Sequence, residues 1–192
     1  MHTTYIGLGA NLPSAAGTPQ ATLAAASARL ESLGRVTCRS SLYSTAPMGF
    51  AEQPRFVNAV IELETDIEPR DLLNRLLAIE QEFGRDRSTG ITNGPRTLDL
   101  DILLYDDRIV AEGIHEGGLQ IPHPRLAERA FVLVPLCEIA PGIVAAGSGA
   151  TVSQLLDRLR KTAGNETDAV VPIQSDGWRA GACGNGVSAR AD

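Results

Sequence analysis

The sequence has little of what marks several common functional classes. Its three cysteines, Cys38, Cys137 and Cys183, are widely spaced and include no CxxC pair. We therefore expect free thiols in a reducing compartment, and neither a disulfide framework nor a zinc site. Lysine and arginine number 17 against 23 acidic residues, which gives a net charge of −6. This balance disfavours a nucleic-acid partner, because affinity for a phosphate backbone requires a basic surface.

Long apolar runs are also missing. The hydrophobic stretches, such as FVLVPL at 131–136, are far too short to span a bilayer. The N-terminal stretch MHTTYIGLGANLP has no basic region of the kind that opens a signal peptide. We therefore expect a cytoplasmic protein without membrane contact.

Two well-known phosphate-binding motifs are absent. GLGANL at 7–12 has Leu12 where the dinucleotide-binding fingerprint requires its third glycine, and the chain contains no GxxxxGKS or GxxxxGKT sequence. An anionic ligand must therefore be met by a local basic cluster of another kind.

The spacing of apolar residues predicts alternating strands and helices. Strand patterns occupy 3–11, 35–45 and 55–65, while helical patterns run over 19–34 and 69–84, each ending at a glycine. The irregular order suits antiparallel neighbours more than parallel crossovers. We therefore expect an α+β fold, a two-layer sandwich with helices packed on a mostly antiparallel sheet.

One domain accounts for most of the chain. Residues 119–142 are broken by prolines into short elements, and 151–162 have the pattern of a short terminal helix. The remainder is rich in glycine and alanine with little periodic apolar content. We expect a single domain over 1–161 and a disordered tail over 162–192.

The stretch NGPRTLDLDILLYDD at 93–107 alternates as a strand with one buried face. Asp99 and Asp101 leave its other face together, with Cα atoms about 7 Å apart. Two neighbouring carboxylates repel, so a partly buried pair raises one pKa or binds a cation, for which Mg²⁺ is well suited. The alternative is that one aspartate pairs with an arginine and the other faces water.

Arginines bracket the polar loop before this strand. Arg85, Arg87 and Arg96 stand out in an acidic chain, and guanidinium groups bind phosphate oxygens in bidentate fashion. Together with the carboxylate pair they favour a phosphate and metal site over a solvated charged loop. Glu80, on the preceding helix, has a stronger claim to be a carboxylate in solution.

A flat ligand is suggested by a second group of residues. Phe56 and Asn58 share one face of the strand at 55–65 and offer an aromatic plane beside an amide. An aromatic residue in a strand is more often a plain core residue, and Phe131 has the same two interpretations. His123 has no partner at metal-ligand spacing, so a structural role is its simplest interpretation.

At this point the sequence resembles a known family, the 6-hydroxymethyl-7,8-dihydropterin pyrophosphokinases of folate biosynthesis. The resemblance runs in order along the chain and rests on YIGLGANL, LYSTAPMGFAEQPRFVNAV, GRDR, NGPRTLDLDILLY and IPHPRLAERAFVLVPLCEIAP. It implies a ferredoxin-like α+β fold and transfer of pyrophosphate from ATP to the hydroxymethyl group of the pterin, with AMP as the other product.

The resemblance also implies roles for individual residues. Two Mg²⁺ ions would be held by Asp99 and Asp101, which with Arg85 and Arg96 form the catalytic set. The pterin would be bound by Thr45, Met48, Phe56, Asn58 and Phe131, and the nucleotide by Glu80, Arg87, Ile102, Leu119 and His123. Asn93 stands where the family usually has tryptophan.

Two other functions remain open from the residues alone. One is a non-catalytic ferredoxin-like binding module, and the other is an ATP-dependent enzyme that acts on another planar alcohol. We expect small-molecule partners, and the resemblance implies that these are ATP and 6-hydroxymethyl-7,8-dihydropterin. We expect no nucleic acid, no membrane, and a monomer.

Overall fold

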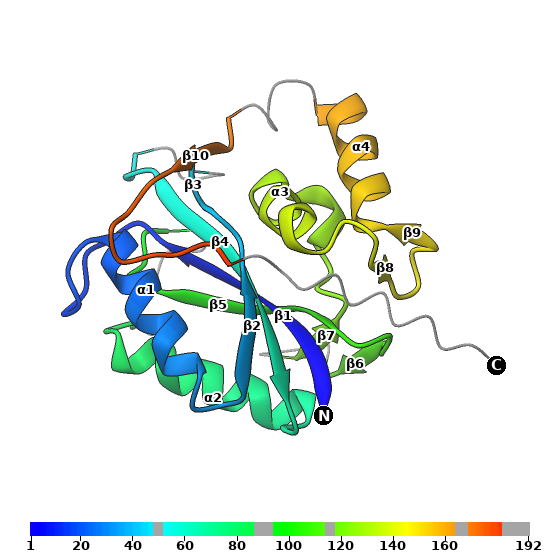
Figure 1. Ribbon diagram of the computed structural model, residues 1–192, viewed down its shortest axis with the longest axis horizontal. Helices are drawn as coiled ribbons and strands as arrows, with labels where there is room; N and C mark the ends of the chain where they lie inside the picture. The colour runs from blue at the N-terminus through cyan, green and yellow to red at the C-terminus, as the bar shows by residue number, and fades with distance from the viewer. Residues whose placement is uncertain (48–51, 87–93, 114–117, 164–168, 182–192) are drawn as a thin grey trace.

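An antiparallel sheet forms the centre of the computed structural model, which describes residues 1–47, 52–86, 94–113, 118–163 and 169–181. In these residues the main sheet has six strands in the order β10-β3-β4-β1-β5, with β2 also paired to β4 (Figure 1). The strands are β1 (His2–Ala10), β2 (Arg35–Arg39), β3 (Leu42–Thr45), β4 (Phe56–Thr65), β5 (Asp99–Tyr105) and β10 (Val171–Ile173).

Helices cover both faces of this sheet. On one face lie α1 (Pro19–Leu30) and α2 (Pro69–Glu82); on the other, α3 (Ala130–Ile139) packs against β4, and α4 (Val152–Ala163) packs against α3. The remaining elements are the hairpins β6 (Val110–Glu112) with β7 (Leu119–Ile121) and β8 (Val144–Ala145) with β9 (Ala150–Thr151), and the 3₁₀ turn η1 (Leu126–Glu128).

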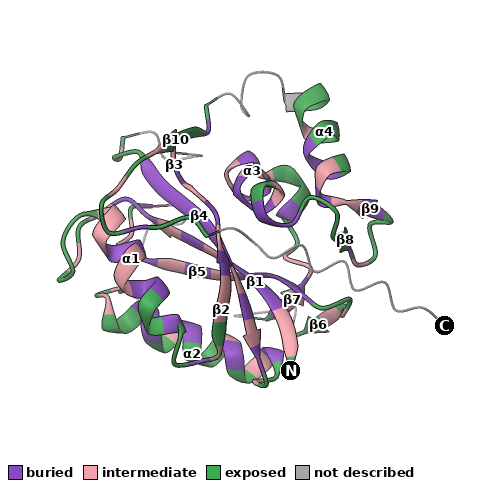
Figure 2. Cartoon of the chain, in the orientation of Figure 1, coloured by how far each residue is buried: buried purple, intermediate pink, exposed green. Residues whose placement is uncertain are grey.

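Alternating side chains along the central strands supply two hydrophobic cores. Ile6 and Ile61 point into the core beneath α1 and α2, whereas Tyr5 and Val60 belong to the core shared with α3 and α4. Figure 2 shows the sheet as the most continuously buried part of the chain. The mixed fold with an antiparallel sheet is confirmed, but the expectation of only two layers is wrong.

The third layer was missed because of a proline. Residues 119–142 were expected to form only short elements, yet α3 continues through Pro135. The helix is buried at Val132, Leu133 and Leu136, and this burial outweighs the hydrogen bond that a proline removes from the helix interior.

The other helices and strands follow the sequence pattern with two differences. α2 ends at Glu82, close to the expected Gly84, which follows the C-cap residue with φ +82°. α1 stops at Leu30, and Gly34 is not in a left-handed conformation but lies where any side chain would meet the carbonyl oxygen of Glu64. The expected strand at 35–45 is divided at Ser40, whose hydroxyl accepts a hydrogen bond from the Val60 N–H at 2.9 Å.

Part of the expected disordered tail is ordered. β10 pairs with β3, and Trp178 is 9% exposed within the α1 and α2 core. The indole Nε1–H donates to the Ser40 carbonyl at 2.7 Å, so the single tryptophan anchors a segment whose composition lacks other apolar periodicity. Residues 164–168 and 182–192 lie outside the described part of the chain.

The expectation of three free thiols is also wrong. Cys38 is disulfide-bonded, whereas Cys137 is free. The sulfur of Cys38 also lies 3.5 Å from the Gly181 carbonyl oxygen, where the C-terminal segment runs beside β2. Long-range contact of this kind cannot be read from cysteine spacing.

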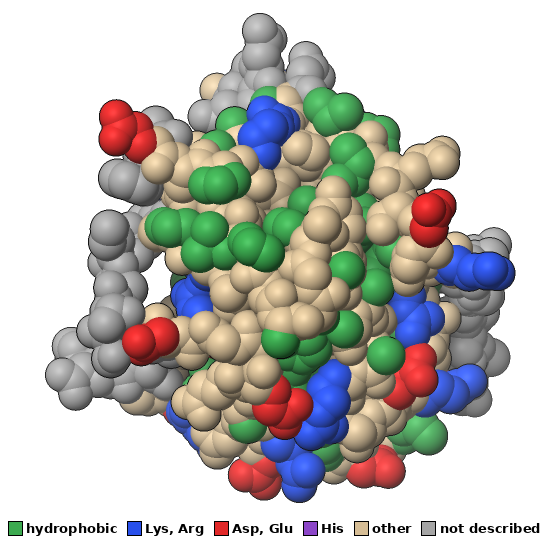
Figure 3. Space-filling model, turned by 90° about the vertical axis from the view of Figure 1, so that its left-hand side faces the viewer, with side chains coloured by type: hydrophobic (Ala, Val, Ile, Leu, Met, Phe, Trp, Pro, Cys, Tyr) green, Lys and Arg blue, Asp and Glu red, His purple; other side chains and the backbone are tan. Residues whose placement is uncertain are grey.

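The surface agrees with the acidic composition. On the face shown in Figure 3, basic and acidic side chains of the described residues are interspersed, without a continuous basic patch among them. No helix in the described ranges is long and apolar enough to cross a membrane.

Candidate active site

A cavity of about 410 Å³ opens on the α3 side of the sheet. Its floor is formed by three neighbouring strands in register. Gly9 of β1 is paired with Asn58 of β4 on one side and with Asp99 of β5 on the other. Gly7, two residues earlier, has Asp101 as its β5 partner. The register thus brings the amide and both carboxylates to one face of the sheet.

The two glycines are site residues that the sequence analysis missed. A Cβ at Gly9 would lie 3.0 Å from Oδ1 of Asn58, and one at Gly7 would lie 3.3 Å from the Leu103 side chain. Both residues line the cavity, so their missing side chains leave room above the floor. The signal was present in YIGLGAN, where glycines two apart share one face of a strand.

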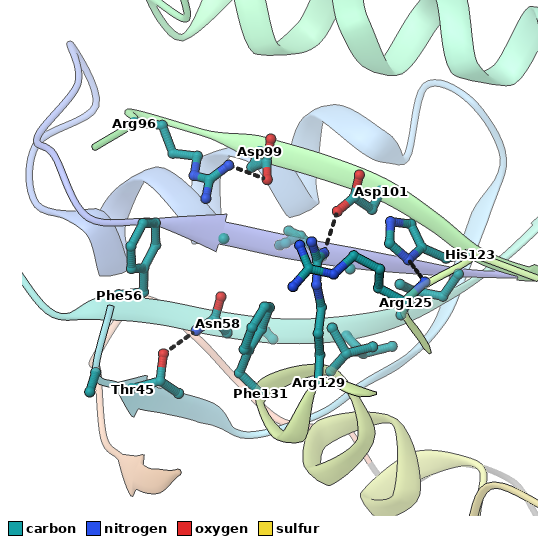
Figure 4. Close-up of a pocket in the computed structure, with 18 of the residues that line it drawn as sticks. Thr45, Phe56, Asn58, Arg96, Asp99, Asp101, His123, Arg125, Arg129 and Phe131 are labelled. Atoms are coloured by element: carbon teal, nitrogen blue, oxygen red, sulfur yellow. Dashed lines mark hydrogen bonds and ion pairs between the residues drawn. The ribbon is translucent and has the colours of Figure 1, made fainter. Parts of the chain in front are cut away.

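Two aromatic rings and an amide line one end of the cavity (Figure 4). Phe56 opens β4, and Phe131 lies in the first turn of α3. Asn58 is 6% exposed, and its Nδ2 donates to Oγ1 of Thr45 at 2.8 Å, which fixes the amide orientation. Met48 lies outside the described residues.

The carboxylates are surrounded by arginines. Asp99 Oδ2 accepts a hydrogen bond from Arg96 Nη1 at 3.0 Å, and Asp99 Oδ1 lies 3.4 Å from Arg85 Nη2. Asp101 has Arg129 Nη1 at 4.0 Å from its Oδ2. Burial first, and then the charge of Asp99, raise the pKa of Asp101 above its ordinary value. One part of the alternative interpretation is therefore present in the ligand-free structure, since Asp99 pairs with arginine.

Arg96 is held by its neighbours in a specific position. Its backbone N–H donates to Oδ1 of Asn11 at 2.7 Å, and its carbonyl accepts the N–H groups of Asn11 and Leu12, each at 3.0 Å. Its guanidinium carbon lies 5.0 Å from the centre of the Phe56 ring. Nε of Arg96 is buried without a hydrogen-bond partner in the described structure, so this arrangement leaves one donor for a ligand.

The donor set fits Mg²⁺ bound together with phosphates. Asp99 and Asp101 supply hard oxygen ligands, and the described residues contain no cluster of three or more metal-binding side chains. Mg²⁺ is usually held in this way, by one or two carboxylates, with waters and substrate phosphates completing its coordination.

A second cavity, of about 260 Å³, adjoins the first. It is lined by Ile102 and Leu119, and Asp101 and His123 line both cavities. Nδ1 of His123 accepts the Arg125 N–H at 3.1 Å, so Nε2 carries the proton of the neutral ring. Burial, followed by the charges of Arg129 and Arg125, lowers the pKa of His123 to about 4.

Glu80 is buried and hydrogen-bonds to the backbone of β5. It is 1% exposed, and its Oε1 accepts the backbone N–H of Leu100 at 2.8 Å. The alternative of a carboxylate in solution is therefore excluded, and Glu80 is not among the residues that line either cavity. Its hydrogen bond fixes β5 between the two aspartates. Arg87 lies outside the described residues.

The first cavity thus gathers most of the predicted residues. It brings together Arg85, Arg96, Asp99 and Asp101 with Thr45, Phe56, Asn58, Phe131 and His123. It also includes Arg125 and Arg129, which the sequence analysis did not single out. Their only sequence signal was the charged stretch immediately before Phe131, within a region whose helix was itself not expected.

Curated relatives match most of the chain. A 2-amino-4-hydroxy-6-hydroxymethyldihydropteridine pyrophosphokinase of Synechocystis is 40% identical over 164 residues, which cover 84% of this chain and 78% of the relative. The protein of the same name from Pseudomonas aeruginosa is 44% identical over 139 residues, covering 72% and 81%.

The fold has solved counterparts, and the sequence matches a family description. A crystal structure of Plasmodium falciparum HPPK-DHPS superposes with a TM-score of 0.70 at 14% identity, over 90% of this chain and 46% of that one. The chain thus spans about half the length of this solved protein. Residues 5–141 match the model of the 7,8-dihydro-6-hydroxymethylpterin-pyrophosphokinase (HPPK) family. With more than half of its residues matched, the chain belongs to the HPPK family.

Proposed function

We propose that the chain transfers the pyrophosphoryl group of ATP to the hydroxymethyl group of 6-hydroxymethyl-7,8-dihydropterin, giving AMP and the pterin diphosphate. One observation carries the proposal beyond family membership. The cavity joins an end suited to a flat polar heterocycle to an end rich in arginine and carboxylate, and it continues into a second cavity through Asp101 and His123.

The pterin is bound at the aromatic end. Phe56 and Phe131 offer ring faces to the heterocycle, and the Asn58 amide, oriented by Thr45, offers its oxygen to a ring N–H. Met48 completes the predicted set. Because the two rings come from β4 and α3, the width of this end depends on how the helix packs on the sheet.

The nucleotide occupies the second cavity and the junction. Ile102 and Leu119 provide apolar contacts, and the Nε2–H of His123 is a donor for a phosphate oxygen. Glu80 acts through β5, which it positions, while Arg87 is proposed to reach the phosphates from the loop after α2. In this arrangement the triphosphate lies between the two cavities and next to the carboxylates.

Asp99 and Asp101 are the residues that would hold magnesium, and two ions are proposed. Bound Mg²⁺ would neutralise phosphate charge and help align the triphosphate. Release of Asp99 from Arg96 and Arg85 on substrate binding would free both guanidinium groups for phosphate oxygens.

The arginines stabilise charge as the reaction proceeds. The pterin hydroxyl attacks the β-phosphorus in line with its bond to the AMP oxygen. The new O–P bond forms as the bond to AMP breaks, AMP leaves with the bridging oxygen, and the proton of the hydroxyl passes to water. Arg96, held by Asn11, and Arg85 face the region where negative charge collects on the transferred group. Most of the rate enhancement then comes from positioning and electrostatic stabilisation.

Several broader features belong to the same proposal. The central strands with α1 and α2 on one face are consistent with a ferredoxin-like arrangement, and residues 1–161 form one pyrophosphokinase domain onto which 169–181 pack. We propose a monomer located in the cytoplasm.

The test is the formation of AMP from ATP with and without the pterin. An enzyme of the proposed type forms AMP only when the pterin is added. Formation of AMP or ADP without pterin would indicate an ATPase or another substrate, and binding without any product would indicate a non-catalytic module.

A further inference from the structure

The four arginines that line the first cavity do not share the same partners. Arg85 and Arg96 pair with Asp99, and Arg129 lies near Asp101. Arg125 differs, because the ion pair recorded for it in the described residues is with Glu128, at 3.6 Å from its Nε. Its side chain is 46% exposed and Glu128 is 68% exposed, so this pair contributes little to stability.

Arg125 lies at the junction of the two cavities. His123 lines both, Pro124 lines the second and Arg125 lines the first, so three consecutive residues mark the boundary. The backbone N–H of Arg125 is fixed by its bond to His123. Figure 4 shows its side chain running toward the guanidinium of Arg129.

Positively charged side chains gather at the junction of the two cavities. Burial is the main cause that lowers the pKa of Arg129 and of His123, and the charge of Arg125 lowers both further, which places all three groups in one electrostatic environment. Bringing two guanidinium groups together costs free energy, and an anion bound between them removes that cost. The cavity lining has four arginines against two aspartates.

We propose that Arg125 is a phosphate-binding residue, which contacts the triphosphate of ATP where it passes from the second cavity into the first. This inference rests on the proposed function, because it takes ATP as the ligand of the second cavity. Arg125 supplies positive charge that no carboxylate of the cavity neutralises, beside the donor Nε2–H of His123.

The test is calorimetric titration of the full chain with Mg²⁺ and a non-hydrolysable ATP analogue, with adenosine as a second probe. Arg125→Ala should weaken binding of the analogue about tenfold, as loss of a charge-assisted hydrogen bond does. Binding of adenosine and of the pterin should change less than about twofold, and Arg125→Lys should recover part of the loss.

Arg160→Ala is the matched control. Arg160 is 55% exposed and pairs with Asp157 three residues away, like Arg125 with Glu128, but lies on α4 outside both cavities. It should bind the analogue as wild type does. Unchanged analogue binding by Arg125→Ala, or an equal loss for adenosine or the pterin, would overturn the inference.

Turnover separates this inference from the proposed function. If the wild type forms pterin-dependent AMP while Arg125→Ala binds the analogue normally, the inference fails and the function stands. If the wild type forms no such AMP but analogue binding still depends on Arg125, the function fails and the phosphate-binding role of Arg125 is supported.

Discussion

The carboxylates and Arg96 have separable effects because a metal site can be refilled and a missing guanidinium cannot. Asp101→Asn should weaken Mg²⁺-dependent ATP binding, and excess Mg²⁺ should partly restore it. Arg96→Ala should lower the single-turnover rate about a hundredfold or more with no such recovery. Rates and ATP dissociation constants measured across a Mg²⁺ titration check both, and wild-type behaviour of Asp101→Asn would contradict the metal role.

His123 predicts a pH dependence of stability in the ligand-free protein. Its pKa is lowered from 6.5 to about 4 in the folded chain, so between these values the unfolded chain binds more protons. Stability should therefore fall as pH decreases from about 6.5 to 4, by about 2 kcal/mol after allowance for partial exposure.

The comparison needed is with His123→Gln, which cannot titrate in this range. Urea unfolding of both proteins from pH 4 to 8 should show a constant difference between their free energies of unfolding above pH 7. Below pH 6.5 the wild type should lose stability relative to the variant. Asp101 has the opposite effect, because its raised pKa makes its contribution to stability grow as the pH falls. This contribution is common to both proteins and cancels in the difference. A pH-independent difference would mean that His123 is not held in its neutral form.

Among secondary-structure elements, β1 shapes the cavity although it contributes no functional side chain to it. Gly9→Ala would place a methyl group 3.0 Å from Asn58 Oδ1, so we expect pterin affinity to fall about tenfold or more while ATP binding changes little. Gly142→Ala is a control, because nothing lies within 4 Å of its Cβ position. Titration with each ligand checks this prediction. Normal pterin binding by Gly9→Ala would show that the space left by Gly9 is not needed for the pterin.

The elements also show what sequence could and could not predict. The α2 helix followed from Leu72, Leu76 and Ile79, and the shared face of Asp99 and Asp101 followed from strand alternation, since both depend on local periodicity. Arg129 and Gly9 were missed because their place depends on how α3 packs on the sheet and on the register of β1 with its neighbours. Such contacts join residues far apart in the chain.

For the chain as a whole, residues 169–181, beyond the family match, add an edge strand to the sheet. β10 and Trp178 follow residue 141, where the family match ends, yet they contact β3 and the α1 core. Arg55, immediately before Phe56, also donates to the Ala169 carbonyl at 3.3 Å. Composition alone suggested disorder there, because one tryptophan and three strand residues leave no periodic pattern.

For the molecule as a whole, the proposed function requires attack on one particular phosphorus of ATP. If the pterin hydroxyl attacks the β-phosphorus, the bond between that phosphorus and the bridging oxygen breaks, and the oxygen leaves with AMP. ATP labelled with ¹⁸O at the α–β bridge should therefore give labelled AMP and an unlabelled pterin diphosphate in equal amounts, as measured by mass spectrometry. ADP as the nucleotide product, or label in the pterin diphosphate, would contradict pyrophosphoryl transfer at this site.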